Sequence, residues 1–123
     1  MEELIARISS AAGINTDVAT KSVGIILNFL RQDGPSDAVD HVMQSLPGAE
    51  AAADAALAEH QAAGNGDGGG GLMALAGHLT GAGLDMGEMQ AVGKELFAAV
   101  HEKAGADTVG AIAGAIPGMH QFI

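Results

Sequence analysis

The sequence contains no cysteine, no tryptophan and no tyrosine, and phenylalanine occurs only three times. Without cysteine the chain forms no disulfide, carries no thiol nucleophile and offers no zinc–thiolate centre. Large aromatic anchors are scarce, whereas glycine alone occupies 19 of the 123 positions. We therefore expect one domain whose stability comes from closely spaced helices with small side chains at their contacts.

Long apolar runs and basic clusters are also lacking. No stretch reaches the ~18 apolar residues of a membrane span, and the opening residues MEELIARI begin with acids, unlike a secretory signal. The chain has 15 acidic and 5 basic residues, a formal net charge of −10. Dispersed acids are typical of a solvated surface, and this charge disfavours nucleic-acid binding. We expect a soluble cytoplasmic protein that binds neither membranes nor nucleic acids.

Two Pro-Gly pairs are the most informative feature of the sequence, and they lie 70 positions apart in SLPGA (45–49) and AIPGM (115–119). When the sequence is shifted by 70, residues 13–49 align with residues 83–119 without a gap. Apolar character is kept at six pairs of positions, which predicts that one helical unit occurs twice. These pairs are Ile14 and Leu84, Ile26 and Leu96, Leu27 and Phe97, Leu30 and Val100, Val42 and Ile112, and Leu46 and Ile116. Identities at this offset include Gly13 and Gly83, Asp37 and Asp107, Val39 and Val109, and the two Pro-Gly pairs.

Each copy of the unit is predicted to contain three helices. In the first copy the hydrophobic spacing favours helices over 2–11 and about 16–33, followed by a short helix that Pro47-Gly48 ends. Asn15 or Thr16 is the expected N-cap of the second helix, and Ser36 or Asp37 that of the third. The second copy repeats the pattern at about 72–81, 85–103 and 106–116.

The remaining segments connect the two copies. Repeat 1 covers about 1–48, an alanine-rich connecting helix covers 49–62, and repeat 2 covers about 72–118. Between them lies the linker 63–71, whose run GNGDGGGG predicts flexibility and not a phosphate-binding loop, because no strand precedes it and no Lys-Ser/Thr follows. Two separate three-helix domains are an alternative, but each would have fewer than ~50 residues and be marginally stable alone. We therefore predict a single all-α domain of six to seven helices, packed as one pseudo-twofold bundle over 1–123.

A resemblance to a known family follows from the same Pro-Gly pairs and apolar spacing. It is carried by GLDMGEMQAVGKEL, GADTVGAIAGAIPG and VGIILNFLRQDGPSDAVDHVMQSLPGA. These stretches resemble small bacterial helical proteins of unknown function, the VcgC/VcgE-type and related duplicated helical domains, in which Leu-Pro-Gly follows a short helix. The resemblance covers nearly the whole chain and implies a bacterial all-α protein, but it implies no activity and no catalytic residue.

Candidate chemistry is sparse. Asp37 and His41 are spaced to share one helix face, as two metal ligands would be. Asp37, however, has a simpler role at a helix N-terminus, and no histidine recurs at the 70-residue offset, so a symmetric metal site is not expected. No Gly-x-Ser-x-Gly elbow is present. We expect no enzymatic activity, no catalytic residue, no metal and no cofactor. The five histidines are His41, His60, His78, His101 and His120.

The third helices of the two copies differ in a way that points to an interface. The outer face of the first carries Asp40, His41 and Gln44, whereas the matching positions of the second carry glycine and alanine. Glycine inside a helix costs about 1 kcal/mol relative to alanine, so something should offset it. Either this helix is buried on both faces, for example against 49–62, or it forms an exposed apolar interface. The candidate interface residues are Gly110, Ala111, Gly114, Ala115, Met119 and Phe122.

These observations favour a non-enzymatic protein-interaction module that is either a homodimer or the partner of another protein, joined through the apolar C-terminal helix. The alternative is a carrier of a small apolar ligand, with a pocket between the two halves. A metal-binding protein is a third hypothesis, which rests only on Asp37 and His41.

Overall fold

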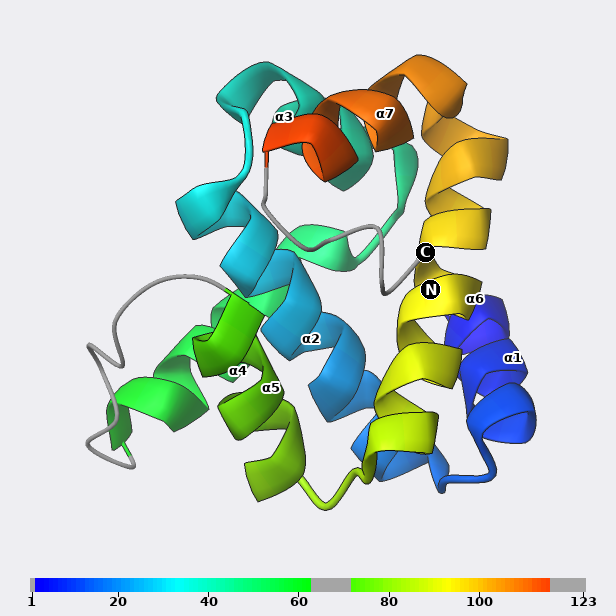
Figure 1. The fold of residues 1–123 in the computed structure, drawn as a ribbon, viewed down its shortest axis with the longest axis vertical. Helices are drawn as coiled ribbons and strands as arrows, with labels where there is room; N and C mark the ends of the chain where they lie inside the picture. The colour runs from blue at the N-terminus through cyan, green and yellow to red at the C-terminus, as the bar shows by residue number, and fades with distance from the viewer. Residues whose placement is uncertain (1, 63–71, 116–123) are drawn as a thin grey trace.

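The computed structural model describes residues 2–62 and 72–115, and these residues form seven α-helices and no strand (Figure 1). The predicted all-α class is therefore confirmed. The glycine-rich linker and the C-terminal Pro117-Gly118 lie outside the described residues. The helices are α1 (Glu2–Ala12), α2 (Thr16–Asp33), α3 (Ser36–Ser45), α4 (Ala49–Ala62), α5 (Leu72–Gly81), α6 (Met86–Ala104) and α7 (Ala106–Ala115).

The starting residues of the helices repeat at the offset found in the sequence. The helices α5, α6 and α7 begin 70 residues after α1, α2 and α3, respectively. The helix starts therefore agree with the predicted repeat, and the duplication itself stays a prediction. Only α4 has no counterpart among the described residues.

The N-termini of α2 and α6 are fixed by the same capping interaction. The side chain of Asn15 accepts a hydrogen bond from Val18 N at 2.8 Å, and Asp85 accepts one from Glu88 N at 2.8 Å. The Glu88 carboxylate also accepts from Asp85 N at 2.9 Å, which completes a capping box. Of the two caps proposed for α2, Asn15 is confirmed, since the following threonine is already helical.

The expected cap of α3 is wrong. Neither Ser36 nor Asp37 occupies the N-cap position, because Pro35 does so in an extended conformation and makes no side-chain capping bond. Ser36 is consequently the first helical residue, and the Asp37 carboxylate lies in the first turn, where it is favoured by the helix dipole. The helix ends at Ser45, one residue before the Leu46 expected inside it, and Gly48 of the expected Pro47-Gly48 stop has a positive φ of 89°.

One continuous core joins all the helices. On α1 the buried residues are Leu4, Ile5 and Ile8, which lie at helical spacing. Helix α2 is central, with contacts to α1, α3, α4, α5 and α6. Its buried Ser22 is satisfied because the hydroxyl donates to Val18 O at 2.7 Å. The largest fully buried side chains are Ile8, Ile26, Leu27, Leu30, Leu75, Leu79, Leu96 and Ile112.

In terms of the two predicted copies, the first helix of each packs on the second helix of the other, which would be an exchange of first helices. Helix α1 packs on α6, and α5 packs on α2. At the first of these contacts Arg7 bridges two acids, with Nε 3.0 Å from Glu95 Oε2 and Nη2 3.1 Å from Glu102 Oε2. These hydrogen bonds, the Glu95 one first, raise the pKa of Arg7 above its ordinary value. The exchange is what a pseudo-twofold would produce, but α4 covers α2 without a described equivalent on α6, so the symmetry stays a prediction.

The helices α2 and α4 approach each other most closely at Gly24. A Cβ atom built on Gly24 would lie 2.5 Å from the backbone oxygen of Ala52 and 3.1 Å from the Cβ of Ala56. Only a residue without a side chain permits this contact. The position that corresponds to Gly24 in α6 is Lys94, which is exposed. The expectation of closely spaced helices with small contact residues is therefore met at the α2–α4 crossing.

Candidate interaction surface

Helix α7 is buried on one side only over its described length. It packs on α6 and α3 through Thr108, Ile112 and Ala113, which are buried. The Thr108 hydroxyl donates to Ala104 O at 3.1 Å, so this buried polar group has a partner. The alternative in which the helix is covered on both faces is not met for residues 106–115, because the opposite side of the helix is exposed.

The exposed side of α7 carries four of the six predicted interface residues. Gly110, Ala111, Gly114 and Ala115 are all exposed, and we call these four residues the α7 face. The structure therefore brings them together on one surface. The other two predicted residues, Met119 and Phe122, lie outside the described residues.

The two glycines of the α7 face are not required by the packing of the described chain. A Cβ atom built at Gly110 or Gly114 would meet no atom within 4 Å. Neither residue has a positive φ, so an alanine would adopt the same backbone conformation. Each glycine costs about 1 kcal/mol relative to alanine in a helix. In this respect they differ from Gly24, whose lack of a side chain is required by α4.

A polar strip lies beside the α7 face. Helix α3 packs against α7, and both lie at the same end of the molecule (Figure 1). The outer side chains of α3, Asp40, His41 and Gln44, are exposed as predicted. They occupy the positions that correspond to Gly110, Ala111 and Gly114. One end of the protein thus presents a strip of small apolar residues next to a strip of polar residues.

The side chains considered as metal ligands do not form a site in the described structure. Asp37 and His41 are both exposed on α3. Among the side chains that the structure describes, which exclude those of Asp33, Glu59 and His60, no three His, Asp or Glu groups lie close enough together to hold a metal ion. His120 lies outside the described residues. The metal hypothesis therefore gains no support from the geometry.

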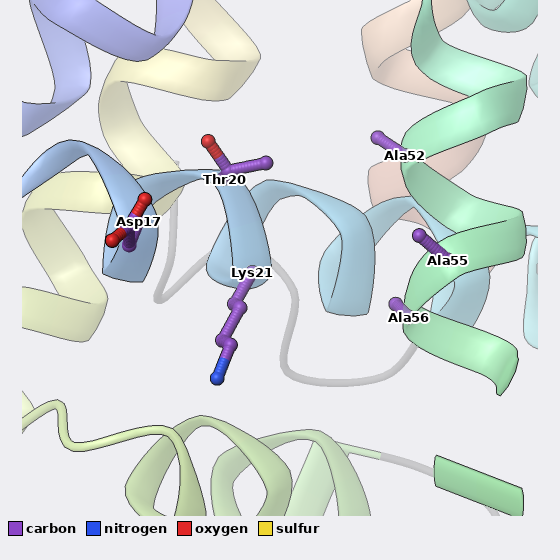
Figure 2. A pocket seen from close by; sticks show the side chains of 6 residues that line it. All are labelled: Asp17, Thr20, Lys21, Ala52, Ala55 and Ala56. Carbon is purple, nitrogen blue, oxygen red and sulfur yellow. The ribbon is translucent and has the colours of Figure 1, made fainter. Parts of the chain in front are cut away.

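A hollow of about 400 Å³ lies between α2 and α4. Figure 2 shows its polar residues along α2, with the methyl groups of α4 pointing into the space between the helices. Both helices belong to residues 2–62, so this hollow is not the pocket between the two halves that the carrier hypothesis predicts. It is lined by Asp17, Thr20, Lys21, Ala52, Ala55 and Ala56.

Sequence reasoning missed the α2–α4 crossing and the hollow beside it. A signal was present, since Ala49, Ala53 and Ala56 follow helical spacing and all three are buried. Buried alanines along one side of a helix indicate that a second helix packs closely against that side. A glycine on the second helix permits such a close approach. The sequence did not show which helix carried that glycine.

Comparison with family models, curated proteins and solved structures finds no match for this chain. The resemblance to VcgC/VcgE-type proteins accordingly stays a prediction. In the part of the chain that the structure describes, no helix combines the length and the apolar character needed to cross a membrane.

Proposed function

We propose that this protein is a non-enzymatic helical interaction module that forms a homodimer through the α7 face. The observation that carries the proposal is the exposure of Gly110 and Gly114 on a helix where neither the backbone conformation nor a neighbouring residue requires glycine. In a dimer the absent side chains would let a second helix come close. Close packing of the two helices would then offset the low helix propensity of the glycines.

A second copy of the chain is a suitable partner for this surface. A twofold axis through the α7 face would place the same four residues on both sides, as an isologous interface requires. Small residues on both helices allow the backbones to approach closely without interlocking large side chains. The charge of −10 on each chain opposes this association, so we expect a dimer of moderate affinity that is sensitive to salt.

The experiment that tests the proposal introduces a large side chain on the α7 face. Gly114→Leu should abolish the dimer while leaving the helix content unchanged, because nothing in the described chain lies within 4 Å of the new Cβ. Gly77→Leu is the matched control, since Gly77 is an exposed glycine in the middle of α5 with equally open surroundings. Light scattering gives the mass and circular dichroism gives the helix content.

The comparison of Gly114→Leu with Gly77→Leu has one outcome that supports the homodimer and one that contradicts it. A dimer that is lost in Gly114→Leu and kept in Gly77→Leu supports the proposal. A Gly114→Leu protein that dimerises like the wild type contradicts it.

The carrier alternative predicts instead a bound small molecule. Native mass spectrometry of the purified protein would detect it as a small addition to the monomer mass of 12.2 kDa.

A further inference from the structure

We propose that α4 is a separately opening unit, which leaves its place on α2 while the other helices stay folded. The proposal does not depend on the α7 face. It rests on the kinds of side chain that hold α4 and on the uneven fit between α4 and α2.

The contact surface of α4 consists of small side chains. Its buried residues are Ala49, Ala53 and Ala56, and its one large apolar side chain, Leu57, is only half-buried. A buried methyl group removes far less apolar area from water than a buried leucine or isoleucine does. Helix α2, in contrast, buries large side chains such as Ile26, Leu27 and Leu30. Detaching α4 from α2 therefore exposes much less apolar surface than unfolding α2 does.

The fit between the two helices is close at one point and open beside it. The close point is Gly24, with its hypothetical Cβ 2.5 Å from Ala52 O. Beside this point lies the hollow of about 400 Å³, into which the methyl groups of Ala55 and Ala56 point (Figure 2). The packing of α4 on α2 is thus uneven, since Ala56 is buried against Gly24 while Ala55 beside it is exposed and lines the hollow.

The polar contact between the helices is also weak. Arg31 Nη1 lies 2.9 Å from Asp54 Oδ1, but the Asp54 side chain is 68% exposed. An exposed ion pair contributes little, and salt screens it. The sequence of α4, AEAAADAALAEHQA, is rich in strong helix formers, so leaving α2 does not require the helix itself to unwind at once. Opening therefore uncovers the Gly24 side of α2 at low cost.

Native-state hydrogen exchange followed by mass spectrometry tests this proposal on the full chain. We expect amides of α4 to be protected at least ~100-fold less than amides of α2 and α6. Asp54→Asn should lower the protection of α4 by roughly 2-fold. Gly24→Ala should lower it further. Exchange of α4 amides should also depend much less on urea concentration than exchange of α2 and α6 amides, because opening α4 exposes less surface than global unfolding. Gly77→Ala, a substitution in α5, should not change the protection of α4.

Two results would overturn the proposal. One is equal protection of α4 and α2, which would mean that both open only in global unfolding. The other is a dependence of α4 exchange on urea concentration as steep as that of α2 and α6, because α4 would then open only together with the rest of the core. The Asp54→Asn variant keeps the proposal testable if Gly24→Ala fails to fold.

Discussion

Replacing Gly24 by alanine should destabilise the protein, although the same substitution normally stabilises a helix. The new Cβ would lie 2.5 Å from the backbone oxygen of Ala52, so α4 must move by about 1 Å to restore an ordinary contact distance. Overpacking of this kind costs about 1–3 kcal/mol. The gain in helix propensity is about 1 kcal/mol. We therefore expect the free energy of unfolding to fall by roughly 0–2 kcal/mol.

The control for this prediction is Gly77→Ala. Gly77 also lies inside a helix, but a Cβ built there meets nothing within 4 Å, so only the gain in propensity remains. The two variants should therefore differ by about 1–3 kcal/mol, which is the overpacking penalty alone. The destabilisation in Gly24→Ala has an upper bound. Once the overpacking penalty exceeds the free energy with which α4 docks on α2, α4 leaves α2 and the penalty stays at that docking free energy.

The assay follows from the composition. The chain has no tryptophan and no tyrosine, so urea unfolding is followed by far-ultraviolet circular dichroism and not by intrinsic fluorescence. A difference of 1 kcal/mol corresponds to a change in Tm of roughly 4 °C for a domain of this size. If Gly24→Ala is as stable as Gly77→Ala, the close approach of α2 and α4 is not a feature of the protein in solution.

Three further predictions concern the caps, an ion pair and the dimer. Asn15→Ala and Asp85→Ala should each cost about 1 kcal/mol in urea unfolding, because each removes the side-chain oxygen that accepts from a first-turn N–H. The larger loss is expected for Asp85, whose carboxylate also places a negative charge at the helix N-terminus. Equal stability of both variants and the wild type would contradict the capping geometry. Arg7→Gln should lower Tm at low salt, with a smaller effect at high salt, because both of its ion pairs are solvent-exposed; an effect independent of salt would indicate a packing role instead. Raising the salt concentration should strengthen dimerisation, since it screens the repulsion between two chains of charge −10; sedimentation equilibrium that shows weakening would argue against the proposed interface.

Much of the fold could be predicted because its signals are local. The N-cap Asn15, the turn at Gly48 and the apolar spacing of α1 each act over a few residues, so the sequence alone locates the helices to within a residue or two. The error at α3 has a physical reason as well. Pro35 already supplies the extended conformation at the helix start, and Ser36 is then helical and cannot act as the cap.

The arrangement of the helices could be predicted only in part. That α4 crosses α2 at Gly24 depends on contacts between residues about 30 positions apart, and a glycine within a helix has several possible causes. The sequence alone likewise did not decide whether Gly110 and Gly114 are buried or exposed. The structure places both on an exposed side of α7. The sequence pattern showed that glycine at these two positions needed an explanation. The fold excludes one explanation for residues 106–115, namely that α7 is buried on both sides.

The most direct test of the proposed function is the mass of the wild-type protein in solution, measured by size exclusion with light scattering across micromolar concentrations. The proposal predicts a mass that rises from 12.2 kDa towards twice that value as the concentration increases. It also predicts that the rise disappears in Gly114→Leu. A mass that stays at 12.2 kDa over the whole range would contradict the homodimer through the α7 face.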